Sequence, residues 1–228
     1  MIQRHVSVSF MLMGILFCVC LVASNMLETK VVQLGPVALT AGFLVFPISY
    51  IINDCIAEVW GYKKARLIIW MGFMMNFFVA LIGLLAVALS ATPYWSANEP
   101  HFNFVFSLAP RVTIASFTAF LVGSFLNAYV MSKMKLAMGG KHFSWRAVAS
   151  TLVGEGADSL IFFPLAFAGL MPFNEVIKLM VVQVVAKTLY EIIALPITIR
   201  VVKKVKEIEG TDVYDKDISY NILKLKDL

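Results

Sequence analysis

Charged residues are scarce in this chain. Asp, Glu, Lys and Arg make up 14% of its 228 residues, and hydrophobic residues make up 60%. A soluble domain would be about 25% charged and only about half apolar. The composition therefore excludes an ordinary soluble globular domain and favours a protein that presents much of its surface to lipid.

Sequence patterns of catalytic sites are also missing. The three histidines, His5, His101 and His142, all fall in terminal or loop segments, and no HExxH, GxSxG or P-loop motif occurs. The only three cysteines lie within apolar stretches, where they are expected to pack as small hydrophobic side chains. We therefore expect no enzyme activity, no ATP hydrolysis by this chain, and no metal ion or cofactor.

Long apolar stretches fill most of the remaining sequence. Six of them are long enough to cross a bilayer, which takes ~20 residues per helix: 8–27, 37–59, 66–90, 108–131, 147–170 and 176–201. We predict an all-α fold, a polytopic membrane protein whose six transmembrane helices form a single domain over residues 1–228.

Basic residues gather on one side of the predicted spans. They precede the first span and follow the second, fourth and sixth: Arg4, Lys63, Lys64, Arg66, Lys133, Lys135, Lys141, Arg146, Arg200, Lys203, Lys204 and Lys206. Cytoplasmic loops collect Lys and Arg, so both termini are predicted to be cytoplasmic. This distribution accounts for the net charge of +5 without a nucleic-acid partner. Residues 202–228 are predicted to be a cytoplasmic tail, of which 207–228 are expected to be at best partly ordered.

Two of the predicted spans carry charges well inside them. Glu155 and Asp158 are three residues apart, so they share one face of the fifth helix. Lys187 and Glu191 share a face of the sixth, with Gln183 one turn earlier. Hydrocarbon penalises each such charge by roughly 2.5–3.5 kcal/mol, so these side chains are expected to face the bundle interior.

The balance of these charges allows two interpretations. Three acids meet one base, and the surplus negative charge favours a site for a proton, a cation or a solute rich in hydrogen-bond donors. The alternative is an internal salt-bridge network that only holds two helices together, since polar pairs in membranes also serve packing. We predict the first, with all five residues as substrate-binding candidates.

Other polar residues are candidates for gates or ion pairs. Asp54 and Glu58, one turn apart near the end of the second span, form either an interfacial ion-pair cluster with the basic residues that follow or an inner gate. Asn25 ends the first span and Arg111 opens the fourth. Arg111 either extends to lipid headgroups or closes an outer gate by binding Asn25.

Several of these residues stand in a familiar order. The segments are Ser24-Asn25, Phe46–Tyr50 with Asp54, Glu58–Gly61, Lys63–Arg66, Arg111–Phe117, Ser150-Thr151, Asp158-Ser159 and Lys187. In this order, over about residues 15–200, the chain resembles the bacterial queuosine-precursor transporter family, earlier described as a vitamin uptake family. Asn127 is a departure, because many members have an aspartate there.

The resemblance implies a multi-pass importer in the bacterial inner membrane. Its cargo would be the 7-deazaguanines preQ0 and preQ1, with queuine as a further candidate, and it would work by alternating access without ATP. Rival interpretations are a substrate-binding subunit of an energy-coupling-factor transporter and an intramembrane acid–base enzyme. A homodimer is compatible with so small a carrier.

Donor and acceptor matching then suggests roles for individual residues. A guanine-like edge presents adjacent N–H groups, which one carboxylate accepts in a bidentate fashion. Asp158 or Glu155 would make that contact, and Gln183 or Asn25 would bind the carbonyl and ring nitrogens. The aminomethyl cation of preQ1 would suit Glu191 or Glu155. Stacking faces could come from Phe162, Phe163 and Tyr190.

Overall fold

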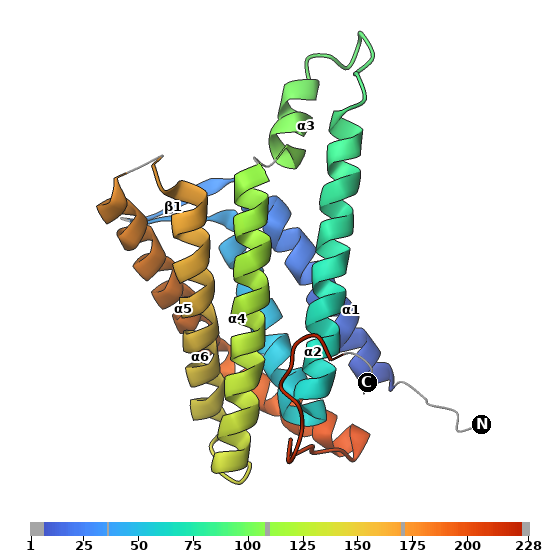
Figure 1. Ribbon diagram of the computed structural model, residues 1–228, viewed down its shortest axis with the longest axis vertical. Coiled ribbons are helices and arrows are strands. Elements are labelled where there is room, and N and C mark those ends of the chain that lie inside the picture. Colours follow the sequence, from blue (N-terminus) through green and yellow to red (C-terminus); the bar gives the residue numbers. More distant parts are fainter. Residues whose placement is uncertain (1–6, 36, 108–109, 170–171, 225–228) are drawn as a thin grey trace, which may run out of the picture.

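The computed structural model describes residues 7–35, 37–107, 110–169 and 172–224, except the side chains of residues 31, 34, 37, 38 and 110–113. Its elements in chain order are α1 (Val8–Leu27), β1 (Val31–Leu34), β2 (Val37–Thr40), the 3-10 helix η1 (Ala41–Leu44), α2 (Phe46–Val87), α3 (Glu99–Phe106), α4 (Pro110–Ala137), α5 (Phe143–Phe167) and α6 (Phe173–Glu209). Figure 1 shows the long helices packed side by side in one bundle. The predicted helical fold class is confirmed.

Helix α2 is two helices joined by a turn. A straight helix of its 42 residues would be ~63 Å long, about twice the thickness of a bilayer core. Gly61 interrupts it with φ 79° and ψ 175°, a conformation that L side chains rarely adopt. We call residues 46–60 the first arm and residues 62–87 the second arm. In Figure 1 the first arm descends to the lower end of the bundle and the second rises to α3.

The polarity of the bundle is inverted relative to a soluble protein. Its outer faces carry large exposed apolar side chains, among them Leu12, Ile15, Phe78, Leu160 and Ile193. Its interior holds buried charges, among them Asp54, Glu58, Arg66, Arg146, Glu155 and Lys187. Within the described residues, four helices are long and apolar enough to cross a membrane: α1, α2, residues Ile114–Ala137 of α4, and α5. The structure therefore has the organisation of a membrane protein.

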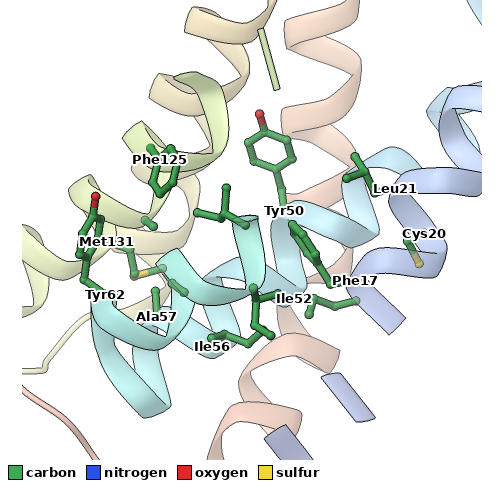
Figure 2. Close-up of a cluster of buried hydrophobic side chains, with 14 of the residues drawn as sticks. Phe17, Cys20, Leu21, Tyr50, Ile52, Ile56, Ala57, Tyr62, Phe125 and Met131 are labelled. Atoms are coloured by element: carbon green, nitrogen blue, oxygen red, sulfur yellow. The ribbon is translucent and has the colours of Figure 1, made fainter. Parts of the chain in front are cut away.

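The core surrounds the first arm of α2. Figure 2 shows Tyr50, Ile52, Ile56 and Ala57 of this arm with side chains from the neighbouring helices. Those neighbours include Phe17 and Leu21 of α1 and Phe125 and Met131 of α4. The first arm is thus the central element against which the other helices are positioned.

The predicted second span begins later than expected. Residues 37–40 were assigned to it, but they form β2, which pairs antiparallel with β1 from Val31↔Thr40 to Leu34↔Val37. Gly35 turns the chain with φ 59°, and η1 leads from the hairpin into α2. A short apolar run suits a strand as well as a helix, so hydropathy alone could not separate the two.

The expectation that the tail is at best partly ordered is wrong for residues 210–224, which pack across the lower end of the bundle. Asp215 is buried there and accepts hydrogen bonds from the Tyr62 backbone N–H (2.8 Å) and the Ser132 hydroxyl (2.5 Å). Arg66 donates to the carbonyls of Ser219 (3.2 Å) and Asn221 (2.6 Å). Backbone and side-chain partners more than 80 residues away therefore order the tail, and hydropathy does not register them.

Candidate functional site

The charged residues predicted on α5 and α6 meet inside the bundle. Nζ of Lys187 lies 2.8 Å from Oε2 of Glu155 and 3.9 Å from Oδ2 of Asp158. All three side chains are buried. The i,i+3 spacing on α5 places both acids on the side that faces α6, as the sequence indicated. We call Glu155, Asp158 and Lys187 the central cluster.

Two other elements complete the surroundings of the central cluster. Nζ of Lys187 lies 3.9 Å from the centroid of the Phe46 ring, at the start of the first arm of α2. Glu28, which follows α1, lies within electrostatic range of Lys187 and Asp158. Sequence reasoning missed both residues, because Phe46 looks like one more apolar residue and Glu28 lies at a span end, where charges are common. They bring α1 and α2 to the same site.

Gln183 lies on the side of the central cluster that faces the β1–β2 hairpin. It is buried one turn before Lys187 on α6, and its Nε2 donates to the Thr40 hydroxyl at 3.3 Å. Thr40 ends β2, so the hairpin that replaced the start of the second predicted span covers this part of the site. The amide oxygen of Gln183 has no hydrogen-bond partner among the described residues.

Glu191 belongs to a second cluster. Its carboxyl lies within hydrogen-bonding reach of the Asp54 carboxyl on the first arm of α2. The Ser150 hydroxyl of α5 donates to Asp54, at 3.2 Å from either oxygen. Asn127 of α4 lies beside the same carboxyl. Glu191 therefore has Asp54 as its nearest acidic partner, while it remains within electrostatic range of Glu155.

Glu58 is the centre of a buried ion network. Arg146 of α5 binds both its carboxylate oxygens, one of them at 3.0 Å from Nη2, and Nζ of Lys206 lies 2.6 Å from Oε1. Nζ of Lys135 lies 3.9 Å away. Of the two interpretations of Asp54 and Glu58, the ion-pair cluster fits Glu58, but the cluster is buried rather than interfacial, and Asp54 is not part of it.

Asp212 of the tail joins this network from below. Its carboxylate lies 2.5 Å from Nζ of Lys135 and 2.8 Å from Nζ of Lys206. Partial burial alone would raise the pKa of Asp212, but the hydrogen bonds from the two lysines outweigh it and hold the pKa below the usual range. The tail thus closes the lower end of the bundle through charge as well as through hydrogen bonds.

Of the predicted pair Asn25 and Arg111, the structure describes the side chain of Asn25 only. Asn25 accepts a hydrogen bond from the Ser116 hydroxyl (3.2 Å) and donates to the Leu21 carbonyl (3.2 Å). It lines a cavity of about 50 Å³ together with Asn76 and Phe117, and the central cluster does not contribute to that cavity. The observed partners of Asn25 are therefore Leu21 and Ser116 rather than the predicted site residues. Arg111 lies in the first turn of α4, and its side chain is outside the described residues.

An apolar exterior around buried, paired charges defines the class, an integral membrane protein with a polar interior. The comparisons with known proteins then give the family. Residues 40–201 match the family model described as "Putative vitamin uptake transporter", and the chain belongs to this family. The predicted family is confirmed, and its members are named as transporters rather than as enzymes.

Three curated relatives carry a more specific name. The chain is 25% identical over 176 residues to a "Probable queuosine precursor transporter" of Bacillus subtilis, covering 77% of this chain and 76% of the relative. It is 30% identical over 132 residues to the Haemophilus influenzae protein of the same name, covering 56% and 52%. It is 28% identical over 147 residues to the "Queuosine precursor transporter" of Escherichia coli, covering 64% and 62%. No solved structure matches the chain significantly.

Proposed function

We propose that this protein imports queuosine precursors across the bacterial inner membrane by alternating access. The names of its three relatives support the cargo. Its six spans would be α1, the two arms of α2, α4, α5 and α6. The turn between the two arms of α2, the start of α1 and the end of α6 lie at one end of the bundle in Figure 1, as cytoplasmic termini require. The basic residues of that end support its assignment to the cytoplasm.

The main support for a substrate site here is an excess of buried hydrogen-bond acceptors around one base, Lys187. Oε1 of Glu155 and the amide oxygen of Gln183 have no hydrogen-bond partner among the described residues. Asp158 lies 3.9 Å from Lys187, too far for a hydrogen bond. Buried acceptors without donors cost about 1–3 kcal/mol each, so a solute that brings N–H groups would be stabilised here.

A 7-deazaguanine has the matching chemistry. Its guanine-like edge carries adjacent N–H donors, and a carboxylate can accept two of them in a charge-assisted pair. Asp158 is better suited to this contact than Glu155, because Glu155 is already bound to Lys187. Gln183 would bind the ring carbonyl through its amide N–H, and the free oxygen of Glu155 would accept from the aminomethyl group of preQ1. Phe46 offers an aromatic face at the same site.

The lower end of the bundle supports alternating access. Glu58, Arg146 and Lys206 join α2, α5 and α6 there, and the tail covers the junction. Solute release into the cytoplasm would require these ion pairs to separate, because they bridge helices on either side of the interior. The network is therefore the inner gate in this proposal, and the structure corresponds to a state closed at that end.

The test is uptake of labelled preQ1 and preQ0 into liposomes that contain only this protein. We expect saturable uptake by the wild type and by Glu175→Gln, an exposed matched control on α6. Asp158→Asn should lower affinity roughly 10–100-fold, since a hydrogen bond to a charged group contributes about 1.5–3 kcal/mol. Binding without uptake by the wild type would contradict a self-sufficient carrier. Absence of binding to either compound would contradict the cargo.

A further inference from the structure

A buried pair of acids lies apart from the central cluster. Asp54 of α2 and Glu191 of α6 are 0% and 2% exposed, and their carboxyls are within hydrogen-bonding reach. Neither has a Lys, Arg or His within 4.0 Å among the described residues, in contrast to Glu58, Glu155 and Asp158. The Ser150 hydroxyl donates to Asp54, and Asn127 and Thr151 lie within hydrogen-bonding reach of Asp54 and Glu191, respectively.

Two carboxyls in this position favour sharing a proton. Like charges this close in a dry interior repel strongly, and two carboxyl groups hydrogen-bond to each other only when one of them is protonated. With one shared proton the pair has a charge of −1. A second proton would give two neutral carboxyls, so its binding and release change the charge of the interior by one.

One carboxylate oxygen of the pair is free to accept that second proton. Oε2 of Glu191 has no hydrogen-bond partner among the described residues, although Glu191 is almost completely buried. Other groups near the pair are Tyr50, Cys55 and Glu58 on α2, Ser150, Thr151 and Glu155 on α5, and Asn127 on α4, with Lys187 one turn before Glu191 on α6. The charges of Glu58, Glu155 and Lys187 are already engaged in the ion pairs described above.

The pair is mechanically connected to the central cluster. Glu191 lies one turn after Lys187 on α6, and Asp54 lies two turns after Phe46, whose ring lies against Lys187, on α2. A movement of α6 relative to the first arm of α2 would change both sites together. Protonation of the pair would remove the charge that α2 and α6 share at this contact, and so would favour one arrangement of the two helices over the other.

We propose that Asp54 and Glu191 form a proton-binding site that couples solute transport to proton movement. In each cycle the pair takes one proton from the outer side, which converts its carboxylate to a carboxyl, and the same O–H bond breaks when the proton is released to the cytoplasm. This inference rests on the proposed function but adds a driving ion to it. It gives neutral preQ0 a driving force that the membrane potential alone does not supply.

The experiment uses liposomes that contain the full-length protein and enclose a pH-sensitive dye. The solute is labelled preQ0, which is neutral and lacks the aminomethyl cation of preQ1, so its own transfer carries no charge. In the wild type, an outside-acid gradient of one pH unit should give roughly tenfold accumulation, and added preQ0 should acidify the lumen. Glu191→Gln and Asp54→Asn should lose both effects but retain exchange of internal for external label. Glu175→Gln should behave as the wild type.

Each result decides between the two proposals. Uptake by the wild type with no lumenal acidification would overturn the coupling and leave the transport function intact. Acidification that persists in both variants would also overturn the coupling. Loss of exchange in both variants would overturn it as well, because the pair would then serve substrate binding or folding. Absence of uptake and exchange in the wild type would contradict the proposed function itself.

Discussion

Lys187 on α6 and Glu155 on α5 form a buried ion pair of 2.8 Å, and this pair fixes the spacing of the two helices at the height of the candidate site. The pair is not balanced, because Asp158 and Glu28 add negative charge around the same lysine. A structural salt bridge needs one acid for one base. In the proposed function, this surplus acid binds the solute.

Replacing Lys187 should destabilise the protein strongly. Lys187→Met leaves Glu155 and Asp158 buried without a base, and loss of one partner of a buried pair costs about 3–5 kcal/mol. The double variant Lys187→Met/Glu155→Gln should recover part of that loss, since it removes the uncompensated charge. Thermal unfolding of the purified protein in detergent checks both. Lys178→Met, which breaks only the exposed pair with Glu175, should have almost no effect on stability. Equal losses of stability in Lys187→Met and Lys178→Met would contradict a buried ion pair at Lys187.

Helices α4 and α5 should be sensitive to a single added methyl group. A Cβ at Gly123 would lie 2.8 Å from the Gly154 carbonyl oxygen, and a Cβ at Gly154 would lie 2.9 Å from the Gly123 carbonyl oxygen. Gly123→Ala or Gly154→Ala must therefore push two backbones apart, at about 1–3 kcal/mol. Gly156 has no heavy atom within 4 Å of the added Cβ, so Gly156→Ala should be neutral or stabilise the helix by about 1 kcal/mol.

The measurement is again thermal unfolding of the three variants in the same detergent. The order of stability should be Gly156→Ala above both of the others. If Gly154→Ala unfolded at the temperature of Gly156→Ala, the close contact of α4 and α5 would be contradicted. The comparison is well matched because Gly154 and Gly156 lie in the same helix, two residues apart.

Much of this fold is readable from the sequence because lipid constrains it so strongly. The first apolar stretch, 8–27, has the bounds of α1. The i,i+3 and i,i+4 spacings on α5 and α6 were sufficient to bring Glu155, Asp158 and Lys187 together. The prediction failed at the start of the second span. A short, mostly apolar run such as residues 37–40 suits a strand as well as a helix, and here it pairs with β1.

The buried ion network around Glu58 could not be predicted from the sequence, for a different reason. Lys135 and Arg146 lie at helix ends beside a basic loop, where charge usually means exposure to water. Their burial depends on Glu58, which lies 77 and 88 residues away, and on a tail that composition alone assigns to partial order. Such partners meet only in the folded chain, and the sequence has no periodic signal for them.

Docking of the tail should depend on Asp212. Its pKa lies below the usual value of 3.8, so its stabilising effect is fully present above that value and is lost as the pH falls through the lowered pKa. At neutral pH Asp212→Asn should loosen the tail and speed tryptic cleavage after the exposed Lys216. The exposed Glu175→Gln is the control and should be cleaved at the wild-type rate. Unchanged cleavage of Asp212→Asn would show that the contacts of Asp215 and Arg66 hold the tail without Asp212.

The two ends of the bundle should lie on opposite sides of the membrane. Ser96 and Lys216 are both exposed. The loop between α2 and α3, which contains Ser96, and the tail, which contains Lys216, lie at opposite ends of the molecule in Figure 1. In a variant whose Cys18, Cys20 and Cys55 are replaced by alanine, Ser96→Cys should react with an impermeant maleimide added to whole cells. Lys216→Cys should react only after the membrane is permeabilised. Equal reactivity of the two sites in intact cells would contradict six spans with cytoplasmic termini, because an even number of spans after the α2–α3 loop, rather than three, would then be required.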